Sequence, residues 1–248
     1  MLQMGLLDIF RTKTSIEGSG VLKGTADRHT HILFGVDDGV RTVEESLEVL
    51  EYEESLGVTD VWCTPHVMED VPNSTAFLKS RFEELVLRYD GPVRLHLAAE
   101  YMLDNLFAER LESDDLLLME DNRLLVETST VMPPYDLKGM LGDAMRKGYA
   151  PVFAHPERCR FLEVKDVEEL HSMGVMFQLN LASLTGYYGE TARKKAEMIL
   201  QKYLYSFYGS DCHRMKVMRA QYERPVLKNN IVKLVASFSF SGGGDKIK

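Results

Sequence analysis

Five of the seven histidines stand in short motifs rich in polar or charged residues. The motifs are, in chain order, Asp27-Arg28-His29-Thr30-His31, Thr64-Pro65-His66, His155-Pro156-Glu157-Arg158 and Ser210-Asp211-Cys212-His213. The carboxylates of Glu100 and Glu127 and the pair Asp37-Asp38 stand between these motifs. Imidazole nitrogens and carboxylate oxygens without thiolates suit divalent manganese, iron or zinc. The chemistry that this pattern favours is therefore that of a metal centre.

The number of candidate ligands indicates more than one cation. The nine candidates are His29, His31, Asp38, His66, Glu100, Glu127, His155, Asp211 and His213. A site for a single cation uses three or four protein ligands. Nine groups therefore predict a cluster of two or three divalent cations that share a bridging carboxylate.

Each motif also has a purely structural interpretation. A carboxylate after a strand can cap a helix, and Pro-His, His-Pro and Asp-Asp-Gly sequences are common in turns. The metal interpretation is favoured because one mechanism explains the polar residues that follow six of seven predicted strands. We assign structural roles to His96, within a strand, and His171, near a helix end, although His96 would share a strand face with Glu100.

The elements that must position these residues alternate along the chain. Short apolar runs predict strands at residues 25–31, 58–64, 93–100, 123–129, 151–155, 175–180 and 206–211. Amphipathic segments predict helices at 42–56, 74–89, 103–112, 135–148, 165–173 and 190–204. Such alternation predicts an α/β fold with a parallel sheet, either open or closed into a barrel. The candidate ligands follow the carboxyl ends of the strands, where α/β barrels gather their chemistry.

The order of the motifs resembles that of the polymerase and histidinol phosphatase (PHP) superfamily. The segments HILFGVDDG, CTPHVM, FAHPERCRF and GSDCHR look most like bacterial tyrosine-protein phosphatases of the CpsB/YwqE type, from capsule and exopolysaccharide operons. The resemblance covers about residues 25–222 and implies a distorted TIM-like (β/α)7 barrel, the PHP fold. It also implies a trinuclear, usually manganese-dependent centre. The implied substrate is the phosphotyrosine tail of a partner bacterial tyrosine kinase that controls polysaccharide export.

The resemblance also implies how the ligands are shared. The implied sets are His29, His31, Glu100 and Asp211 for the first cation, Glu100, Glu127 and His155 for the second, and His66, His213 and Asp38, rather than Asp37, for the third. Arg28 stands where the family usually has an apolar residue. A second phosphate-binding arginine is expected shortly after His213, and neither candidate, Arg214 or Arg219, has the expected spacing.

Hydrolysis of a phosphate ester needs a nucleophile and positive charge around the phosphoryl group, and divalent cations supply both. Arg158 would add planar N–H donors for the phosphoryl oxygens, and we name it with His155 and Asp211 as the catalytic candidates. A cysteine phosphatase requires an arginine six positions after the thiolate. The residues six positions after the three cysteines are Glu69, Lys165 and Met218, which argues against that mechanism.

Composition excludes several classes of protein. The chain has 248 residues, 45% of them hydrophobic, and a net charge of −9, which argues against a nucleic-acid or acidic-lipid binder. Three cysteines without a framework spacing indicate a cytoplasmic protein, and no apolar segment is long enough to span a membrane. We expect a leader at 1–24, a single barrel domain at 25–240 and a flexible tail at 241–248; a homo-oligomer stays open.

Three other functions stay open. The first is a PHP-type phosphoesterase of small molecules, similar to histidinol phosphatase. The second is an amidohydrolase-type metalloenzyme, which also begins with an H-x-H motif but usually has eight strands and a carboxylated lysine where Glu127 stands here. The third is a non-catalytic subunit that binds a kinase tail without cleaving it.

Overall fold

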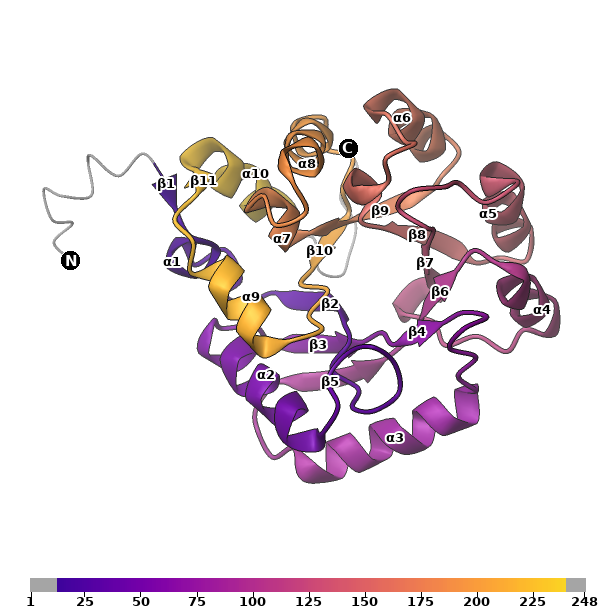
Figure 1. Ribbon diagram of the computed structural model, residues 1–248, viewed down its shortest axis with the longest axis horizontal. Helices are drawn as coiled ribbons and strands as arrows, with labels where there is room; N and C mark the ends of the chain where they lie inside the picture. The colour runs from indigo at the N-terminus through magenta and orange to yellow at the C-terminus, as the bar shows by residue number, and fades with distance from the viewer. Residues whose placement is uncertain (1–12, 240–248) are drawn as a thin grey trace, which may run out of the picture.

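The computed structural model describes residues 13–239, and most of its strands run parallel at the centre of a ring of helices (Figure 1). The strands are β1 (Lys13–Thr14), β2 (Ala26–Thr30), β3 (Asp60–Cys63), β4 (His66–Val67), β5 (Arg94–Leu97), β6 (Glu100–Met102), β7 (Arg123–Glu127), β8 (Ala150–Ala154), β9 (Met176–Asn180), β10 (Phe207–Gly209) and β11 (Leu227–Lys228). The α-helices are α1 (Ile16–Ser19), α2 (Val43–Ser55), α3 (Thr75–Arg88), α4 (Asn105–Ser113), α5 (Leu137–Arg146), α6 (Val164–Ser172), α7 (Leu181–Leu184), α8 (Glu190–Gln201), α9 (Met215–Tyr222) and α10 (Asn229–Ser239). Two 3₁₀ turns, η2 (Glu120–Asn122) and η3 (Pro156–Arg158), precede β7 and follow β8.

The parallel strands form two sheets that continue one another. One has the order β2-β3-β5 and the other the order β10-β9-β8-β7-β6-β4. The predicted strand 58–64 is β3, and β4 follows after Thr64-Pro65, where the proline has no N–H to give to a ladder. The predicted strand 93–100 is divided in the structure. It forms β5, which ends at Leu97, and Glu100 is the first residue of β6 and not the last residue of a strand. Hydrogen bonds from Ala98 N to Cys63 O and from Glu100 N to Pro65 O, both 3.0 Å, carry the pairing across this break.

The sheet is curled, so that its two ends approach one another. The backbone nitrogen of His31 donates to the carbonyl of Cys212 over 3.1 Å, and that of Asp211 donates to the carbonyl of His29 over 2.8 Å. These bonds join β2 to the segment that follows β10, while helices such as α2, α3, α5 and α6 lie around the outside (Figure 1). The predicted α/β class with parallel strands is confirmed. The carboxyl ends of the strands thereby face a common space.

The helix α2 shows how local sequence sets these elements. The side chain of Thr42 accepts a hydrogen bond from Glu45 N over 3.3 Å, which caps the first turn. Val49 and Leu50 are completely buried against the sheet. Gly57, with φ of +82°, turns the chain out of the helix in the left-handed region that glycine tolerates. The observed helix therefore matches the predicted one to within a residue at each end.

Part of the predicted leader packs against the fold. Strand β1 pairs antiparallel with β11, and Ile16 of α1 is buried in the main core. The sequence does not reveal this packing, because a two-residue strand and a four-residue helix are too short to show a period. Helices α9 and α10 were also not predicted. The predicted tail 241–248 lies outside the described residues.

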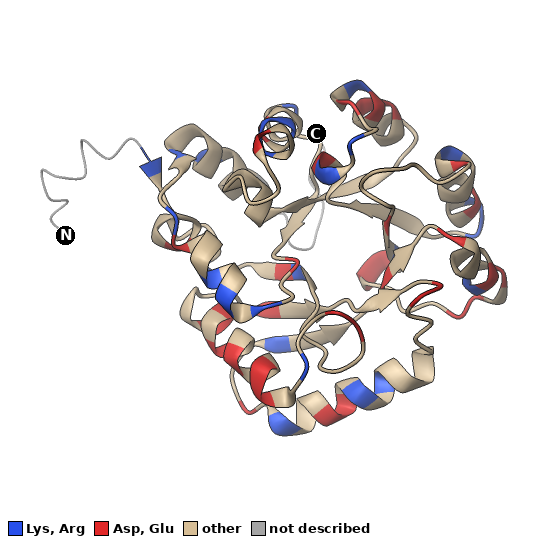
Figure 2. Cartoon of the chain, in the orientation of Figure 1, with Lys and Arg blue, Asp and Glu red and all other residues tan. Residues whose placement is uncertain are grey.

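Charged side chains are spread over the outer helices, with a run of acidic residues along α2 (Figure 2). Much of the net negative charge is therefore distributed away from the space inside the sheet. Within residues 13–239, no helix is both long enough and apolar enough to cross a membrane.

Candidate metal centre

The carboxylate of Glu100 lies at the centre of four histidines. Its Oε2 atom lies 3.2 Å from Nε2 of His29, 3.3 Å from Nε2 of His31 and 3.1 Å from Nδ1 of His66. Its Oε1 atom lies 3.1 Å from Nε2 of His155. The Glu100 side chain is completely buried, so this carboxylate has the position of a bridging group.

Asp211 approaches the same histidines from the end of β10. Its Oδ1 atom lies 3.3 Å from Nε2 of His31, 3.6 Å from Nε2 of His29 and 3.4 Å from Nδ1 of His213. Asp211 and His155 have φ angles of +53° and +37°, a left-handed conformation that is unfavourable for residues other than glycine. Such conformations persist where the surrounding structure imposes them, often at functional sites.

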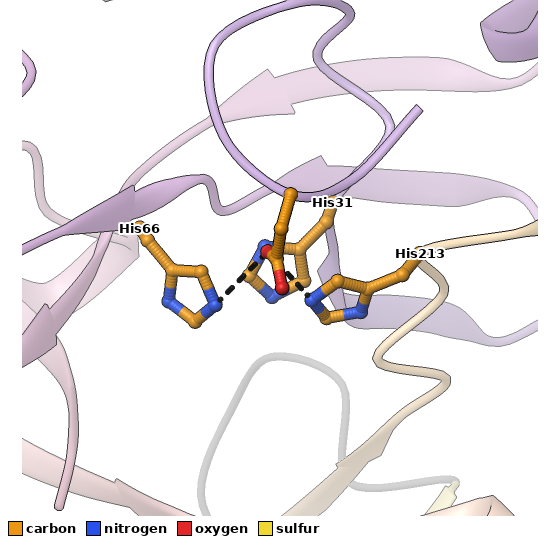
Figure 3. A group of neighbouring side chains, drawn as sticks. His31, His66 and His213 are labelled. Atoms are coloured by element: carbon orange, nitrogen blue, oxygen red, sulfur yellow. Dashed lines mark ion pairs between the residues drawn. The ribbon is translucent and has the colours of Figure 1, made fainter. Parts of the chain in front are cut away.

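Asp38 and Glu127 complete the outer part of the cluster. The Oδ1 atom of Asp38 lies 3.2 Å from Nε2 of His213 and 3.6 Å from Nε2 of His66, and the dashed lines in Figure 3 mark these two pairs. The rings of His31, His66 and His213 gather around this point from separate elements (Figure 3). Glu127 Oε1 lies 3.1 Å from Nδ1 of His66.

All nine predicted ligand side chains therefore lie in one cluster. Four groups have ligand atoms within 4.8 Å of one another: His31, Asp38, His66 and His213; His29, Glu100 and His155; His29, His31 and Asp211; and His66, Glu100 and Glu127. The groups overlap the implied ligand sets but differ in several members. His31 also joins Asp38, His66 and His213, and the group of His29, His31 and Asp211 lacks Glu100. His155 is grouped with His29 and Glu100, and Glu127 is grouped with His66.

The cluster leaves buried polar atoms without a hydrogen bond. Among the described residues, these atoms include Oε2 of Glu100, Nδ1 of His66 and Nδ1 of His155. A buried polar atom without a partner costs free energy, and a buried carboxylate costs more. Cations coordinated here would satisfy Glu100 and His66. The donor set of imidazoles and carboxylates fits divalent manganese, iron or zinc.

The pKa shifts within the cluster also favour positive charge beside its carboxylates. Burial and the neighbouring His31 lower the pKa of His66, but the carboxylates of Glu100 and Glu127 outweigh them and raise that pKa to about 10. The hydrogen bond with His213 is the main cause that lowers the pKa of Asp38 to about 2. The carboxylates thus favour cationic partners, a role that divalent cations fill when imidazoles act as neutral ligands.

Residues around the cluster orient its histidines. Oδ2 of Asp37 lies 2.8 Å from Nδ1 of His31 and accepts from the backbone N of His66 over 3.0 Å. Oε1 of Gln178 lies 2.9 Å from Nδ1 of His29. Contacts of this kind leave Nε2 of each ring free to face a cation. Gln178 was not predicted; its signal was a polar side chain between the apolar Phe177 and Leu179 of β9.

The three predicted arginines have different surroundings. Nη1 of Arg158 donates to Oδ2 of Asp211 over 2.5 Å, at the edge of the cluster. Nη1 of Arg214 donates to the carbonyls of Asp38, over 2.8 Å, and His213, over 2.6 Å. Arg219 instead lies over the ring of Tyr52, with Cζ 4.9 Å from the ring centroid. The structure therefore does not bring Arg219 to the cluster.

The remaining histidines lie elsewhere. Nε2 of His96 lies 2.9 Å from Oδ1 of Asp60, and its ring stacks on Trp62 with centroids 4.6 Å apart. The ring of His171 packs near Phe177. These contacts are structural, as expected for both residues.

The three cysteines are buried thiols. Burial raises the pKa of Cys159 to about 11, and burial also raises the pKa values of Cys63 and Cys212. A nucleophilic thiolate requires the opposite shift. The structure therefore supports the sequence argument against a cysteine-based phosphatase.

The fold and the cluster define an α/β protein with a histidine and carboxylate site at the carboxyl ends of its parallel strands. The chain belongs to the CpsB/CapC family of capsular polysaccharide synthesis, whose family model matches residues 25–237. Its relatives include the tyrosine-protein phosphatase CpsB of Streptococcus agalactiae, which is 30% identical over 210 residues, 77% of this chain and 84% of that protein. They also include the tyrosine-protein phosphatase YwqE of Bacillus subtilis, 26% identical over 199 residues, 77% of this chain and 78% of that protein.

A similar solved structure comes from work on YwqE of Bacillus subtilis and CpsB of Streptococcus pneumoniae, described there as metal-dependent tyrosine phosphatases. It aligns with a TM-score of 0.72 and 24% identity, covering 88% of this chain and 88% of the other. This likeness confirms the fold, a mixed α/β arrangement with a curled parallel sheet. The predicted resemblance to the CpsB/YwqE type is thereby confirmed.

Proposed function

We propose that this protein is a metal-dependent phosphotyrosine-protein phosphatase. The observation that carries the proposal is the cluster of nine histidine and carboxylate side chains, with the N–H donors of Arg158 at its edge. The family membership and the names of the relatives support the same reaction.

The proposed cofactor is two or three divalent cations, with manganese favoured and iron or zinc as alternatives. The proposed ligands are His29, His31, Asp38, His66, Glu100, Glu127, His155, Asp211 and His213. When bound, the cations would activate water and neutralise charge on the phosphoryl oxygens. The strands that hold these ligands would close into the distorted (β/α)7 barrel implied by the resemblance.

Arg158 is proposed to bind the phosphoryl group. Its guanidinium is held by Asp211 through Nη1, so its remaining N–H donors can reach phosphoryl oxygens in a planar fork. Asp211 would therefore both hold a cation and orient Arg158. Arg214, whose Nη1 is already bonded to backbone carbonyls, would contribute positive charge at the rim. His155 would act by holding a cation, and the leaving phenolate needs little assistance from an acid because its pKa is near 10.

The proposed substrate is the phosphotyrosine tail of a cognate bacterial tyrosine kinase that regulates capsule or exopolysaccharide synthesis. The family's association with capsular polysaccharide synthesis supports this choice. The proposed location is the cytoplasm, where such a tail and reduced cysteines would be found.

Turnover of an aryl phosphate and of a phosphotyrosyl peptide tests the proposal. We expect hydrolysis that is lost after chelation and restored by manganese, with elemental analysis showing two or three cations per chain. Failure of every divalent cation to restore turnover would refute it. Faster turnover of histidinol phosphate than of the phosphotyrosyl peptide would favour the small-molecule phosphoesterase instead.

A further inference from the structure

A pocket of about 230 Å³ opens beside the candidate metal centre. Its lining includes Asp211 and His213 of the centre and Arg158, which donates to Asp211. The other lining residues are mainly apolar or aromatic, among them Tyr187 and Val217. The pocket and the centre therefore share polar residues, and a molecule held by Arg158 would extend into the pocket.

Hydrogen bonds fix the turn that carries two of the tyrosines lining this pocket. Tyr187 and Tyr188 are the central residues of a turn closed by a 3.0 Å hydrogen bond from Gly189 N to Gly186 O. Both glycines have positive φ angles, +84° and +94°, which fit the entry to and exit from this turn. The hydroxyl of Thr185 donates to Oε1 of Gln221 over 2.7 Å, which ties the turn to α9.

The two tyrosines of the turn have different environments. The ring of Tyr188 lies beneath the guanidinium of Arg158, with Cζ 4.3 Å from the ring centroid, and its hydroxyl accepts from Nδ2 of Asn180 over 3.2 Å. Stacking on the face of the guanidinium leaves its in-plane N–H donors free. Tyr187 meets Tyr188 edge-on, with centroids 4.9 Å apart, and is 46% exposed.

We propose that this pocket binds the aromatic ring of an aryl phosphate monoester and that Tyr187 determines the preference for aryl over alkyl esters. The inference rests on the proposed function, because the phosphoryl group must lie at Arg158 for its organic group to enter the pocket. The exposed rings and methyl groups of Tyr187 and Val217 then offer contact surface to the substrate ring. Aromatic pairs of this kind prefer edge-to-face or offset geometry, as Tyr187 and Tyr188 already show.

Phosphonates test the subsite without turnover, because their carbon–phosphorus bond is not hydrolysed. We would titrate the full chain, in the presence of manganese, with phenylphosphonate and with methylphosphonate by calorimetry. We expect the wild type to bind phenylphosphonate more tightly. Tyr187→Ala is expected to reduce this aryl preference by about two- to tenfold, the range of an aromatic pair. Tyr187→Phe should retain it, and Tyr135→Ala, at a fully exposed tyrosine, is the matched control.

The outcomes separate the two proposals. In one outcome the aryl preference disappears in Tyr187→Ala, but the wild type does not hydrolyse a phosphotyrosyl peptide. This result would support the subsite and refute the phosphatase. Hydrolysis together with an unchanged preference in Tyr187→Ala would support the phosphatase and overturn the subsite. Equal binding of the two phosphonates by the wild type, or binding of neither, would also overturn it. Unchanged thermal unfolding of Tyr187→Ala would show that its effect is local.

Discussion

Nδ1 of His31 lies 2.8 Å from Oδ2 of the buried Asp37, whereas the next residue, Asp38, points towards His66 and His213. The side chain of Asp37 is completely buried and that of Asp38 is 72% exposed. Two adjacent carboxylates therefore have separate places, one behind a histidine ring and one facing the space between two others. This arrangement supports Asp38 as the ligand, which the family resemblance favoured.

The pair Asp37→Asn and Asp38→Asn should separate these roles. Asp37→Asn replaces the carboxylate that orients His31, and removal of such a group typically weakens metal affinity by about 10–100-fold. It should also lower the melting temperature, because Asp37 accepts hydrogen bonds from the backbone of His66 and Gly39. Asp38→Asn should lower the number of bound cations with little change in melting temperature. Elemental analysis and thermal unfolding measure both effects; identical behaviour of the two variants would contradict this assignment.

Arg158→Lys should lower kcat/KM on an aryl phosphate by about 100-fold, the size of effect seen when one donor to a developing charge is lost. Lysine cannot reproduce the planar fork of N–H donors. Arg219→Lys is the matched control, because Arg219 lies over Tyr52 and not at the cluster, and we expect a change within about twofold. Steady-state kinetics at saturating manganese would measure both variants. A comparable loss in Arg219→Lys would show that this arginine reaches the substrate.

Gln178→Leu should weaken manganese binding by about 10–100-fold, since it removes the oxygen that lies 2.9 Å from Nδ1 of His29. The leucine has a similar volume, so the loss should come from the orientation of the imidazole. Gln201→Leu, at the exposed end of α8, supplies the same change of residue away from the centre. Titration with manganese of the metal-free protein measures the affinity. Equal affinities of Gln178→Leu and the wild type would remove Gln178 from any role in the centre.

Glu53→Gln should flatten the dependence of stability on pH. Burial, followed by the charge of Asp27 and the hydrogen bond to it, raises the pKa of Glu53 well above its usual value of about 4.5. Above pH 4.5 the Glu53 carboxyl group stays protonated in the folded protein, whereas it releases its proton in the unfolded chain. This group therefore stabilises the fold fully below that pH, and its contribution is lost as the pH rises towards the folded pKa.

Above pH 5, the free energy of unfolding should change with pH more steeply in the wild type than in Glu53→Gln. The expected difference in slope is up to about 1.4 kcal/mol per pH unit. Urea unfolding between pH 5 and pH 8 measures it. Glu54→Gln, at the exposed neighbouring position, should keep the slope of the wild type. Parallel curves for the wild type and Glu53→Gln would show that Glu53 is ionised in the folded protein.

The amino-acid sequence by itself determined the class of fold and the membership of the cluster. Parallel strands place their carboxyl ends at one edge of a sheet. Motifs that follow such strands can therefore be predicted to meet before any contact between them is known. This reasoning found His29 and Asp211, which are far apart in the chain and have side-chain atoms 3.6 Å apart. It also predicted helix α2, because a cap, a buried stripe and a terminal glycine are local signals.

Only the tertiary structure decided which partner each group takes. The contact of Gln178 with His29 joins residues 149 positions apart, and no local pattern encodes it. The separate directions of Asp37 and Asp38 depend on the loop that carries them, and the placement of Arg219 depends on which face α9 turns to Tyr52. Periodicity reports which side of an element is buried, whereas a contact between side chains requires the packed positions of both elements.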